Sequence, residues 1–519
     1  MAKKFNVTGL CFADEHYMAD VSGKLKSTLK MVHDGDYFII NRPRQYGKTT
    51  TLYALEEILE KTEQYLIFNI SFEGIGDVIF EDEQLFASTF FNLLARRIPK
   101  KQPAIFKWMT DTLPTIKTLF DLSVAITDLA EKTTKKLVLL IDEVDKSSNN
   151  QLFVSFLAML RHKYLDRRSE KTFHSIILAG LHDVKSLKLK IRADEEQKYN
   201  SPWNIAADFK VNMNLLPHEI KPMLDDFAHE KGVKIDTQEM ADGLFYYTSG
   251  YPFLVSKLCK ILDEDILPTK EVKELTNQDL EQSVKKLVAE SNTNFESLIK
   301  NLENNPKLYD LVYDVAVEGL SVDYNFNEPT NNLGVLHGIF SENKRLSIHN
   351  RIYSEVIINY MTAKMSRIQM AKGADFGSGY VSGDKKLNME LALLKFQSFM
   401  KEQYSKQDRD FLERNGRLVF LAFMKPILNG QGYDFKEVQI SEECRLDVTI
   451  TFYQHRYVAE LKIWRGQAAH QEGLNQLNDY LNRLNLTEGY LIVFDHKEIK
   501  TWQSEWINHE GKKIFMVWV

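Results

Sequence analysis

Short apolar runs alternate with stretches of helical periodicity in the first part of the chain. Four runs are almost wholly apolar: residues 37–40, 65–72, 137–141 and 174–181. Strands of a parallel sheet are buried on both faces and show this pattern. Between the runs, apolar spacing predicts helices over residues 21–33, 49–61, 82–97, 153–164 and a stretch before Lys135. Strands alternating with helices predict a doubly wound α/β domain whose ligand lies at the carboxyl ends of the strands.

The pattern becomes helical from about residue 212. Pro217 stands at the first turn of a helix, where a missing N–H costs little, and residues 248–254 interrupt two helices. Residues 278–302 read as one long amphipathic helix. A short hairpin around residues 340–348, after further helices, gives the outline of a winged helix. Such modules often bind DNA, but others serve only as structural lids.

Residues 371–384 carry four glycines and little apolar content, which is typical of a linker. Beyond it the pattern predicts helices, a hairpin, a leucine-rich helix and a buried strand: residues 387–404 and 408–427, 446–463, a stretch from Leu474 to Leu484, and 488–494. We therefore expect five parts: an α/β core (1–210), a helical lid (211–300), a winged-helix-like region (301–370), a linker (371–386) and a second α/β domain (387–519).

The first candidate site follows the apolar run at 37–40. The chain there enters a polar turn that ends in Gly47-Lys48-Thr49 and a helix. Free backbone N–H groups at a helix start bind phosphate, a lysine neutralises its charge, and a hydroxyl holds Mg²⁺. Arg42 stands where the usual phosphate-loop pattern has its first glycine. A basic turn before an ordinary helix is the alternative interpretation.

A second motif favours the phosphate-binding interpretation over the basic turn. The apolar run at 137–141 ends in Asp142-Glu143. A carboxylate at the carboxyl end of a buried strand can bind Mg²⁺, and its neighbour can activate a hydrolytic water. Alone, such a run is usually a strand that meets solvent, but behind a Gly-Lys-Thr loop it predicts a site for ATP and Mg²⁺. The residues expected at the nucleotide are Arg44, Gln45, Tyr46, Gly47, Lys48, Thr49 and Thr50, with Thr49 and Asp142 at the metal and Glu143 catalytic.

The hairpin over 446–463 carries a second candidate site. We predict a turn at Gln454-His455, so that Tyr453 opposes Arg456. The alternation of the strands then gives one apolar face and one mixed face. The mixed face collects Asp447, Thr449, Thr451, Val458, Glu460 and Lys462.

The charges of that face predict phosphodiester hydrolysis. Asp447 falls opposite Lys462 and diagonal to Glu460 in this register. Two carboxylates a few ångströms apart can hold Mg²⁺, which polarises the phosphate and supplies hydroxide at neutral pH. Lys462 would offset charge in the transition state or orient the water. A sheet with one solvated, mixed-charge face is the alternative, and the flanking helices and strand favour the catalytic interpretation.

The composition of the chain limits which binding partners and which cellular compartment are expected. The 519 residues are 44% hydrophobic and 27% charged, as expected of several soluble folded domains. The net charge of −6 shows no global basicity that would favour nucleic acid, although local patches can bind it. Cys11, Cys259 and Cys444 lack metal-ligand spacing and suit a reducing compartment. No signal core and no membrane-length run is visible, so we expect a cytoplasmic protein without a membrane partner.

Three motifs resemble the AAA-ATPase-like family of prokaryotes: Arg42-Pro-Arg-Gln-Tyr-Gly-Lys-Thr, Leu140-Ile-Asp-Glu-Val-Asp-Lys and Gly250-Tyr-Pro-Phe. Arg-Pro-Arg before the loop is usual in that family. Asp447, Glu460-Leu-Lys462, residues 463–466 and residues 473–481 resemble the PD-(D/E)XK nuclease domain that is commonly fused to such ATPases. The two resemblances cover nearly the whole chain. They imply a P-loop parallel-sheet ATPase with a helical lid and winged-helix-like region, followed by an α/β nuclease-like domain.

The ATPase resemblance implies nucleotide contact by Lys48 and Thr49, Mg²⁺ handling by Asp142 and a catalytic role for Glu143. It also suggests that Gly250, Tyr251 and Pro252 lie against the nucleotide from the lid, where a simple helix break is the alternative.

The nuclease resemblance assigns metal binding to Asp447 and Glu460 and catalysis to these two and Lys462. Glu413 and Gln476 are accessory candidates, although Gln476 could equally be an exposed helix residue.

Other charged residues are weaker candidates. His182, after the fourth strand, could sense the γ-phosphate, but a structural histidine is the commoner case. Arg161, Arg167 and Arg168 include possible arginine fingers, but most surface arginines are solvated charges.

We expect an ATP-regulated, metal-dependent nuclease, with DNA favoured as the nucleic acid. A role against foreign or mobile DNA rests on the family analogy alone. One rival is an ATP-driven switch or scaffold whose nuclease-like domain only binds DNA or a protein. Another is an ATPase that remodels a protein partner. A homo-oligomer is compatible with the sequence, which does not fix the oligomeric state.

Overall fold

The computed structural model describes residues 3–98, 102–144, 151–180, 203–316, 320–369, 380, 386–403, 416, 419–421, 423–424, 427–428, 433–436, 439–441, 444–445, 448–452, 455–464, 466–495 and 502–519. The chain forms two compact units: residues 1–294 with 332–339, and residues 295–331 with 340–519. The boundaries of the five expected parts stay predictions.

A four-stranded parallel sheet lies at the centre of the first unit, in the order β1-β4-β3-β2. Its strands are β1 (Tyr37–Asn41), β2 (Tyr65–Ser71), β3 (Lys136–Asp142) and β4 (Ser175–Gly180). An extended segment at Ala207 adds a parallel bridge to Phe38 of β1. The parallel α/β fold expected from the alternating pattern is confirmed. All carboxyl ends lie at one edge, where parallel sheets bind their ligands.

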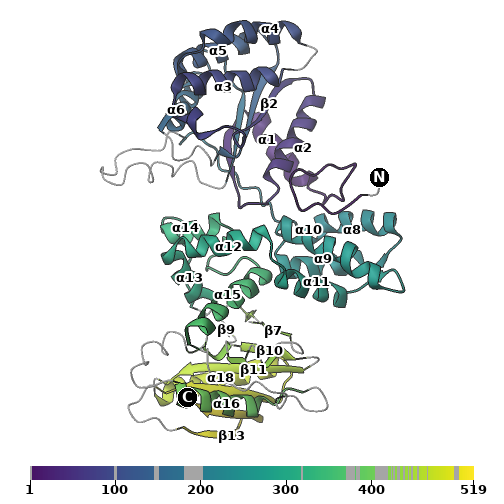
Figure 1. Ribbon diagram of the computed structural model, residues 1–519, viewed down its shortest axis with the longest axis vertical. Coiled ribbons are helices and arrows are strands. Elements are labelled where there is room, and N and C mark those ends of the chain that lie inside the picture. The colour runs from purple at the N-terminus through teal and green to yellow at the C-terminus, as the bar shows by residue number, and fades with distance from the viewer. Residues whose placement is uncertain are drawn as a thin grey trace. The chain divides into compact units, whose positions relative to one another are not determined.

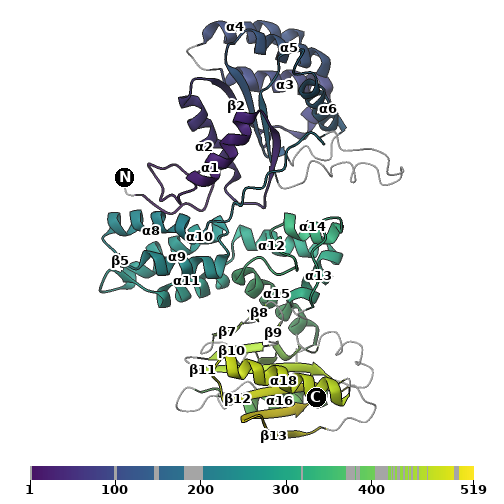
Figure 2. The same ribbon diagram turned by 180° about the vertical axis from the view of Figure 1, so that it is seen from behind.

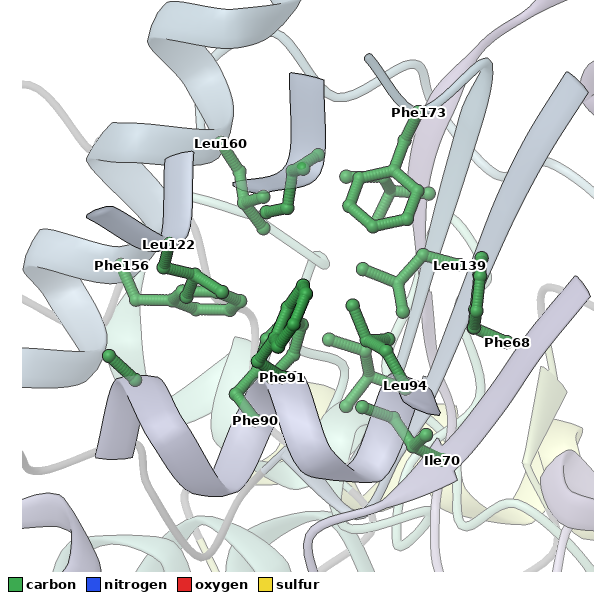
Figure 3. Packing of buried hydrophobic residues seen from close by; sticks show 14 of the residues in the cluster. Phe68, Ile70, Phe90, Phe91, Leu94, Leu122, Leu139, Phe156, Leu160 and Phe173 are labelled. Atoms are coloured by element: carbon green, nitrogen blue, oxygen red, sulfur yellow. The ribbon is translucent and has the colours of Figure 1, made fainter. Parts of the chain in front are cut away.

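Helices cover both faces of this sheet, with α3, α5 and α6 on one side and α1 and α2 on the other (Figures 1 and 2). Their bounds are α1 (Ser22–Asp34), α2 (Lys48–Lys61), α3 (Glu83–Arg96), α4 (Pro103–Thr112), α5 (Leu119–Glu131) and α6 (Gln151–Leu165), with short 3₁₀ turns η1 (Asp77–Phe80) and η2 (Leu113–Thr115). Figure 3 shows the core on the first of these faces, where Phe68 and Leu139 of the sheet face Phe91 and Leu94 of α3. This burial orients the sheet edge that carries the candidate site.

Short helices follow the sheet within the first unit, in the part that the sequence predicts to be a lid. Its elements are α8 (Pro217–Lys231), β5 (Lys234–Ile235), α9 (Thr237–Thr248), α10 (Pro252–Ile261), η5 (Leu262–Ile266), η6 (Leu267–Thr269), β6 (Glu274–Leu275) and α11 (Asn277–Ala289). The expected long helix over 278–302 is wrong. It is two helices, α11 and α12 (Thr293–Glu303), because Glu290 adopts an extended backbone at φ −87° and ψ 137° and its side chain pairs with Lys257 at 2.8 Å.

The second unit begins with helices and a short hairpin. Its helices are α13 (Pro306–Ala316) and α15 (Arg351–Gln369), while α14 (Pro329–Leu336) continues into the first unit. Phe340 and Ile348 form an antiparallel bridge, and the Ser341 N–H donates to the carbonyl of Ser347 at 3.0 Å. The small hairpin expected near residues 340–348 is therefore present. Among the helices that the structure describes, none is long and apolar enough to cross a membrane.

A six-stranded sheet of order β13-β14-β12-β11-β10-β7 forms the rest of the second unit. Its strands are β7 (Tyr433–Lys436), β10 (Val448–Phe452), β11 (His455–Ile463), β12 (Glu488–Phe494), β13 (Ser504–His509) and β14 (Lys512–Trp518), beside the separate pair β8 (Gln439–Ser441) and β9 (Cys444–Arg445). Strands β11, β12 and β14 are parallel to one another, and the other pairs are antiparallel. Helices α16 (Met389–Gln403) and α18 (Gln467–Arg483) contribute to two separate cores on this sheet. Tyr380, inside the expected linker, is buried in the core that includes α16.

The hairpin of β10 and β11 forms, but its predicted register is wrong by two residues. Phe452 pairs with His455 and Val448 with Ala459, whereas the prediction paired Tyr453 with Arg456. A shift of two keeps every side chain on its expected face because alternation along a strand has a period of two. The hydrophobic pattern therefore could not separate the two registers.

Candidate nucleotide site and hairpin site

The phosphate loop joins β1 to α2 at the carboxyl edge of the first sheet. Gln45 and Gly47 adopt left-handed backbone conformations, at φ 57° and 76°. A Cβ on Gly47 would meet nothing within 4 Å, so its backbone angle alone explains the glycine. No side chain caps the start of α2. A helix start directly after such a loop is where backbone N–H groups bind an anion.

Lys48 lies beneath this loop. Its side chain is buried, and Nζ donates to the carbonyls of Arg42 at 2.9 Å and Pro43 at 3.0 Å. These bonds hold the ammonium group against the inside of the loop, close to the helix start. A buried lysine with backbone acceptors supplies a fixed positive charge where phosphate oxygens would collect.

Thr49 and Asp142 meet although they are far apart in sequence. Thr49 Oγ1 donates to Asp142 Oδ2 at 2.6 Å, and Asp142 is buried at the end of β3. One carboxylate and one hydroxyl offer the oxygen ligands that Mg²⁺ prefers, and this ion usually takes its remaining ligands from water and phosphate. Within the described ranges no group of three or more His, Cys, Asp or Glu residues could hold a metal by itself. The pair therefore fits Mg²⁺ that arrives with a nucleotide.

Glu143 follows directly and has a strained backbone. Its φ is 54°, and its N–H donates to Asp142 Oδ1 at 3.0 Å. A left-handed conformation is uncommon for a residue other than glycine, and such strain collects at functional sites. The bond orients the Asp142 carboxylate and fixes the direction in which the chain leaves β3.

The lid contacts the phosphate loop through Tyr251. Tyr251 Oη donates to the Arg44 carbonyl at 2.6 Å, and its ring lies edge-on to Tyr46 with centroids 4.6 Å apart. A Cβ on Gly250 would lie 2.2 Å from the Leu215 carbonyl, so no other residue fits there. Pro252 is the first residue of α10. The structure thus brings Tyr251 to the loop, and contact of Tyr251 and Pro252 with a nucleotide stays a prediction.

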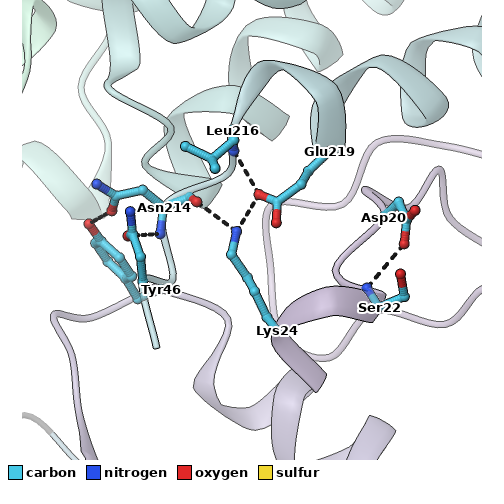
Figure 4. A network of polar contacts seen from close by, with 8 residues as sticks. Asp20, Ser22, Lys24, Tyr46, Asn214, Leu216 and Glu219 are labelled. Atoms are coloured by element: carbon cyan, nitrogen blue, oxygen red, sulfur yellow. Dashed lines mark hydrogen bonds and ion pairs between the residues drawn. The ribbon is translucent and has the colours of Figure 1, made fainter. Parts of the chain in front are cut away.

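A polar network joins the same region to α1 (Figure 4). Tyr46 Oη bonds to Asn214, and Lys24 Nζ donates to the Asn214 carbonyl at 2.7 Å. Lys24 also pairs with Glu219, which accepts the Leu216 N–H at 2.7 Å. Burial lowers the pKa of Lys24, and the Glu219 carboxylate acts in the opposite direction. The network fixes the start of α8 against the strand–loop–helix unit.

Three further candidates of the first unit have local partners, and one lies outside the described residues. Thr50 Oγ1 accepts the Cys11 N–H at 3.4 Å. Arg161 Nε donates to Asn204 at 2.8 Å, and Arg167 donates to the Tyr164 carbonyl at 2.8 Å. His182 lies outside the described residues.

The second candidate site centres on β11 and α18. Glu460 is buried, and Lys462 Nζ lies 3.1 Å from Glu460 Oε1. Lys462 Nζ also donates to Gln476 Oε1 of α18 at 2.8 Å. Val458, on the same face, is buried in the core beneath α18. Where the structure describes it, the mixed face is buried at Thr449, Val458 and Glu460. Asp447 and Glu413 lie outside the described residues, so their roles stay predictions.

Gly473 explains how Lys462 reaches Gln476. A Cβ on Gly473 would lie 3.1 Å from Lys462 Cγ and 3.3 Å from Cε. The lysine stem therefore crosses α18 directly over this glycine. The sequence pattern does not predict this contact, because glycine inside a helix usually only lowers helix stability.

Comparisons with known proteins cover about two-thirds of the chain. Solved structures similar to it include the Aeropyrum pernix ORC2 protein in its ADPNP-ADP complexes, at 14% identity and a TM-score of 0.36, covering 66% of this chain and 93% of that one. The Thermotoga maritima RuvB Holliday junction branch migration motor is similar at 16% identity and TM-score 0.32, covering 64% and 93%. The A. pernix ORC1 protein in complex with DNA is similar at 10% identity and TM-score 0.32, covering 67% and 94%. These scores are too low to carry a functional argument.

No protein with a curated description matches the sequence. The profile of the AAA-like domain family matches residues 10–355, which include the phosphate loop, Asp142-Glu143, the lid and the small hairpin. The ATPase part of the resemblance inferred from the motifs is thereby confirmed, and the family suggests nucleotide binding and ATPase activity. The match ends before the six-stranded sheet, so the nuclease resemblance stays a prediction. The chain belongs to the AAA-like domain family.

Proposed function

We propose that the first unit binds ATP with Mg²⁺ and hydrolyses it slowly. The hydrogen bond between Thr49 and Asp142 carries this proposal, because it joins the helix that follows the phosphate loop to the acidic end of β3. Thr49 and Asp142 would hold Mg²⁺, which neutralises phosphate charge when bound. Lys48 places its positive charge at the β- and γ-phosphates. Glu143 takes the proton of the attacking water.

Phosphate release from ATP tests the proposal with two variants of the full chain. Glu143→Gln keeps the size and polarity of the side chain and should retain ATP binding while turnover falls by about a hundredfold, as expected when a general base is removed. Lys48→Ala should lose binding and turnover together. Equal ATP turnover by the wild type and Glu143→Gln would show that Glu143 takes no part in hydrolysis.

We infer, as a second proposal, that the C-terminal part cleaves DNA with Mg²⁺ under control of the ATPase. The contact of Lys462 with buried Glu460 and with Gln476 supports it, since a cation beside a carboxylate is the arrangement that phosphodiester hydrolysis uses. Glu460, with Asp447, would hold the metal. Lys462 then orients the water or offsets the transition-state charge.

A different function would use the same fold as an ATP-driven switch whose last domain only binds DNA or a protein. Incubation of linear and circular DNA with Mg²⁺, in the presence and absence of ATP, separates the two functions. Cleavage that disappears in Glu460→Gln supports the nuclease. Salt-dependent DNA binding without cleavage supports the switch.

A further inference from the structure

Each of the four residues between Arg42 and Gly47 contacts a segment from beyond residue 210. The Arg44 carbonyl and the Tyr46 side chain are held by Tyr251 and Asn214, as described above. The other two contacts come from places that no motif singles out. Asn294 bonds to Gln45, and Gly338 lies against Pro43.

The contact of Asn294 restrains a strained position. Asn294 Nδ2 donates to Gln45 Oε1 at 2.9 Å, and Asn294 itself is only 5% exposed. Gln45 has a φ of 57°, a conformation that a residue with a side chain adopts only when its surroundings favour it. The bond ties the side chain of this residue to a buried anchor near the start of α12.

The contact of Gly338 is made by its backbone. A Cβ on Gly338 would lie 2.7 Å from Pro43 Cγ and 3.0 Å from Pro43 Cβ, and its φ is 70°. No residue other than glycine fits this close approach without moving the proline. Pro43 also presents its carbonyl to Lys48 Nζ at 3.0 Å. Gly338 therefore packs against the residue whose carbonyl binds Lys48 Nζ, the ammonium group that we expect to meet the phosphates.

We infer that Asn294 and Gly338 are positioning residues of the phosphate loop, which hold it in the conformation that binds ATP. The inference rests on the proposed ATP site. It adds that the segments around Asn294 and Gly338 control the affinity of this site for ATP. Preorganised loops bind more tightly because less ordering remains to be done on binding. Coupling is reciprocal, so bound ATP must in turn stabilise the segments around Asn294 and Gly338. The chain passes from the first unit to the second directly after residues 294 and 339. ATP binding is thereby coupled to the two places where the chain leaves the first unit.

Calorimetric titration of the full chain with Mg²⁺ and ATP tests the positioning role. Asn294→Ala and Gly338→Ala should each raise the Kd for ATP about threefold to tenfold, as expected for the loss of one hydrogen bond or an equivalent contact. Gly232→Ala is the matched control. Gly232 has a similar φ of 64°, but a Cβ there would meet nothing within 4 Å. This variant should carry the same backbone strain and leave the Kd unchanged.

A double-mutant cycle shows whether Asn294 acts through Gln45. If it does, the Kd of the double variant Asn294→Ala/Gln45→Ala should equal that of Gln45→Ala alone, whereas a purely structural role would make the two effects add. Amide hydrogen exchange gives the reciprocal readout. ATP should slow exchange over residues 332–339 in the wild type, and this protection should shrink in Asn294→Ala.

The outcomes separate the inference from the proposed function. If the wild type does not bind ATP, the proposed function fails and the inference falls with it. If the wild type binds ATP but Asn294→Ala and Gly338→Ala bind equally well, only the inference is overturned. If Gly338→Ala fails to fold, the ATP affinity of Asn294→Ala alone tests the inference, because this substitution removes atoms and causes no steric clash. Additive effects in the cycle, or exchange at residues 332–339 that ATP does not alter, also contradict the inference.

Discussion

Gly473→Ala separates the stability of the second sheet from its proposed chemistry. Gly473 lies inside α18, where alanine is favoured over glycine by about 1 kcal/mol. An added Cβ would meet Lys462 Cγ at 3.1 Å, a contact tighter than nine in ten real ones. The stem of Lys462 must therefore move by a few tenths of an ångström, although the helix itself becomes more stable.

The bond between Lys462 and Gln476 sets the size of the expected effect. Displacing the stem weakens the 2.8 Å bond from Lys462 Nζ to Gln476, and a hydrogen bond to a charged group contributes about 1.5–3 kcal/mol. Loss of about 1.4 kcal/mol in the transition state lowers a rate tenfold. We therefore expect Gly473→Ala to cleave DNA about tenfold more slowly. The helix gain of about 1 kcal/mol offsets most of the weakened hydrogen bond, so the free energy of unfolding should change by about 1 kcal/mol or less.

The assay pairs initial cleavage rates under Mg²⁺ with urea unfolding. Asp479→Ala is the control, because Asp479 is exposed on the same helix and the substitution raises helix propensity away from Lys462. It should match or exceed the stability of the wild type and cleave at the wild-type rate. If Gly473→Ala is more stable and equally active, the position of Lys462 does not matter to the reaction. A loss of both stability and activity would show that the glycine serves packing alone.

Three further predictions follow from the second unit. Lys462→Met should reduce cleavage about a hundredfold and lower stability by about 3 kcal/mol at most, since Glu460 then stays buried without its cation; adding Glu460→Gln should restore stability but not cleavage, and recovery of cleavage would refute the assigned roles. Limited proteolysis should first cut between residues 371 and 379, ahead of the buried Tyr380, and N-terminal sequencing that finds the first cut elsewhere would contradict this. Burial lowers the pKa of His349 from 6.5 to about 4, so the unfolded chain binds a proton that the folded chain does not. Stability should therefore fall by about 1.4 kcal/mol per pH unit from pH 6.5 down to about 4 relative to His349→Gln, and parallel pH profiles for the two proteins would exclude this cause.

The sequence predicts a helix or strand correctly where the hydrophobic pattern within that element is enough to define it. Apolar runs marked β1, β2, β3 and β4 because a buried strand needs them along its whole length. The amphipathic period continues across Glu290, so it does not predict the break between α11 and α12. Both registers of the β10–β11 hairpin bury the same side chains, so the pattern does not predict which of them forms.

The candidate site divides in the same way. Lys48, Thr49 and Asp142 are predictable because phosphate and Mg²⁺ chemistry restricts residue types at fixed spacing. The sequence does not predict the contacts of Asn294 with Gln45 and of Gly338 with Pro43, because only the tertiary fold brings these residues together.

The most direct test of the central claim is the titration of the purified full chain with ATP and Mg²⁺, wild type beside Lys48→Ala and Glu143→Gln. We expect saturable, one-to-one binding by the wild type and by Glu143→Gln, and none by Lys48→Ala, because only that substitution removes the charge held under the loop at Arg42 and Pro43. Equal ATP affinity in the wild type and Lys48→Ala would contradict it.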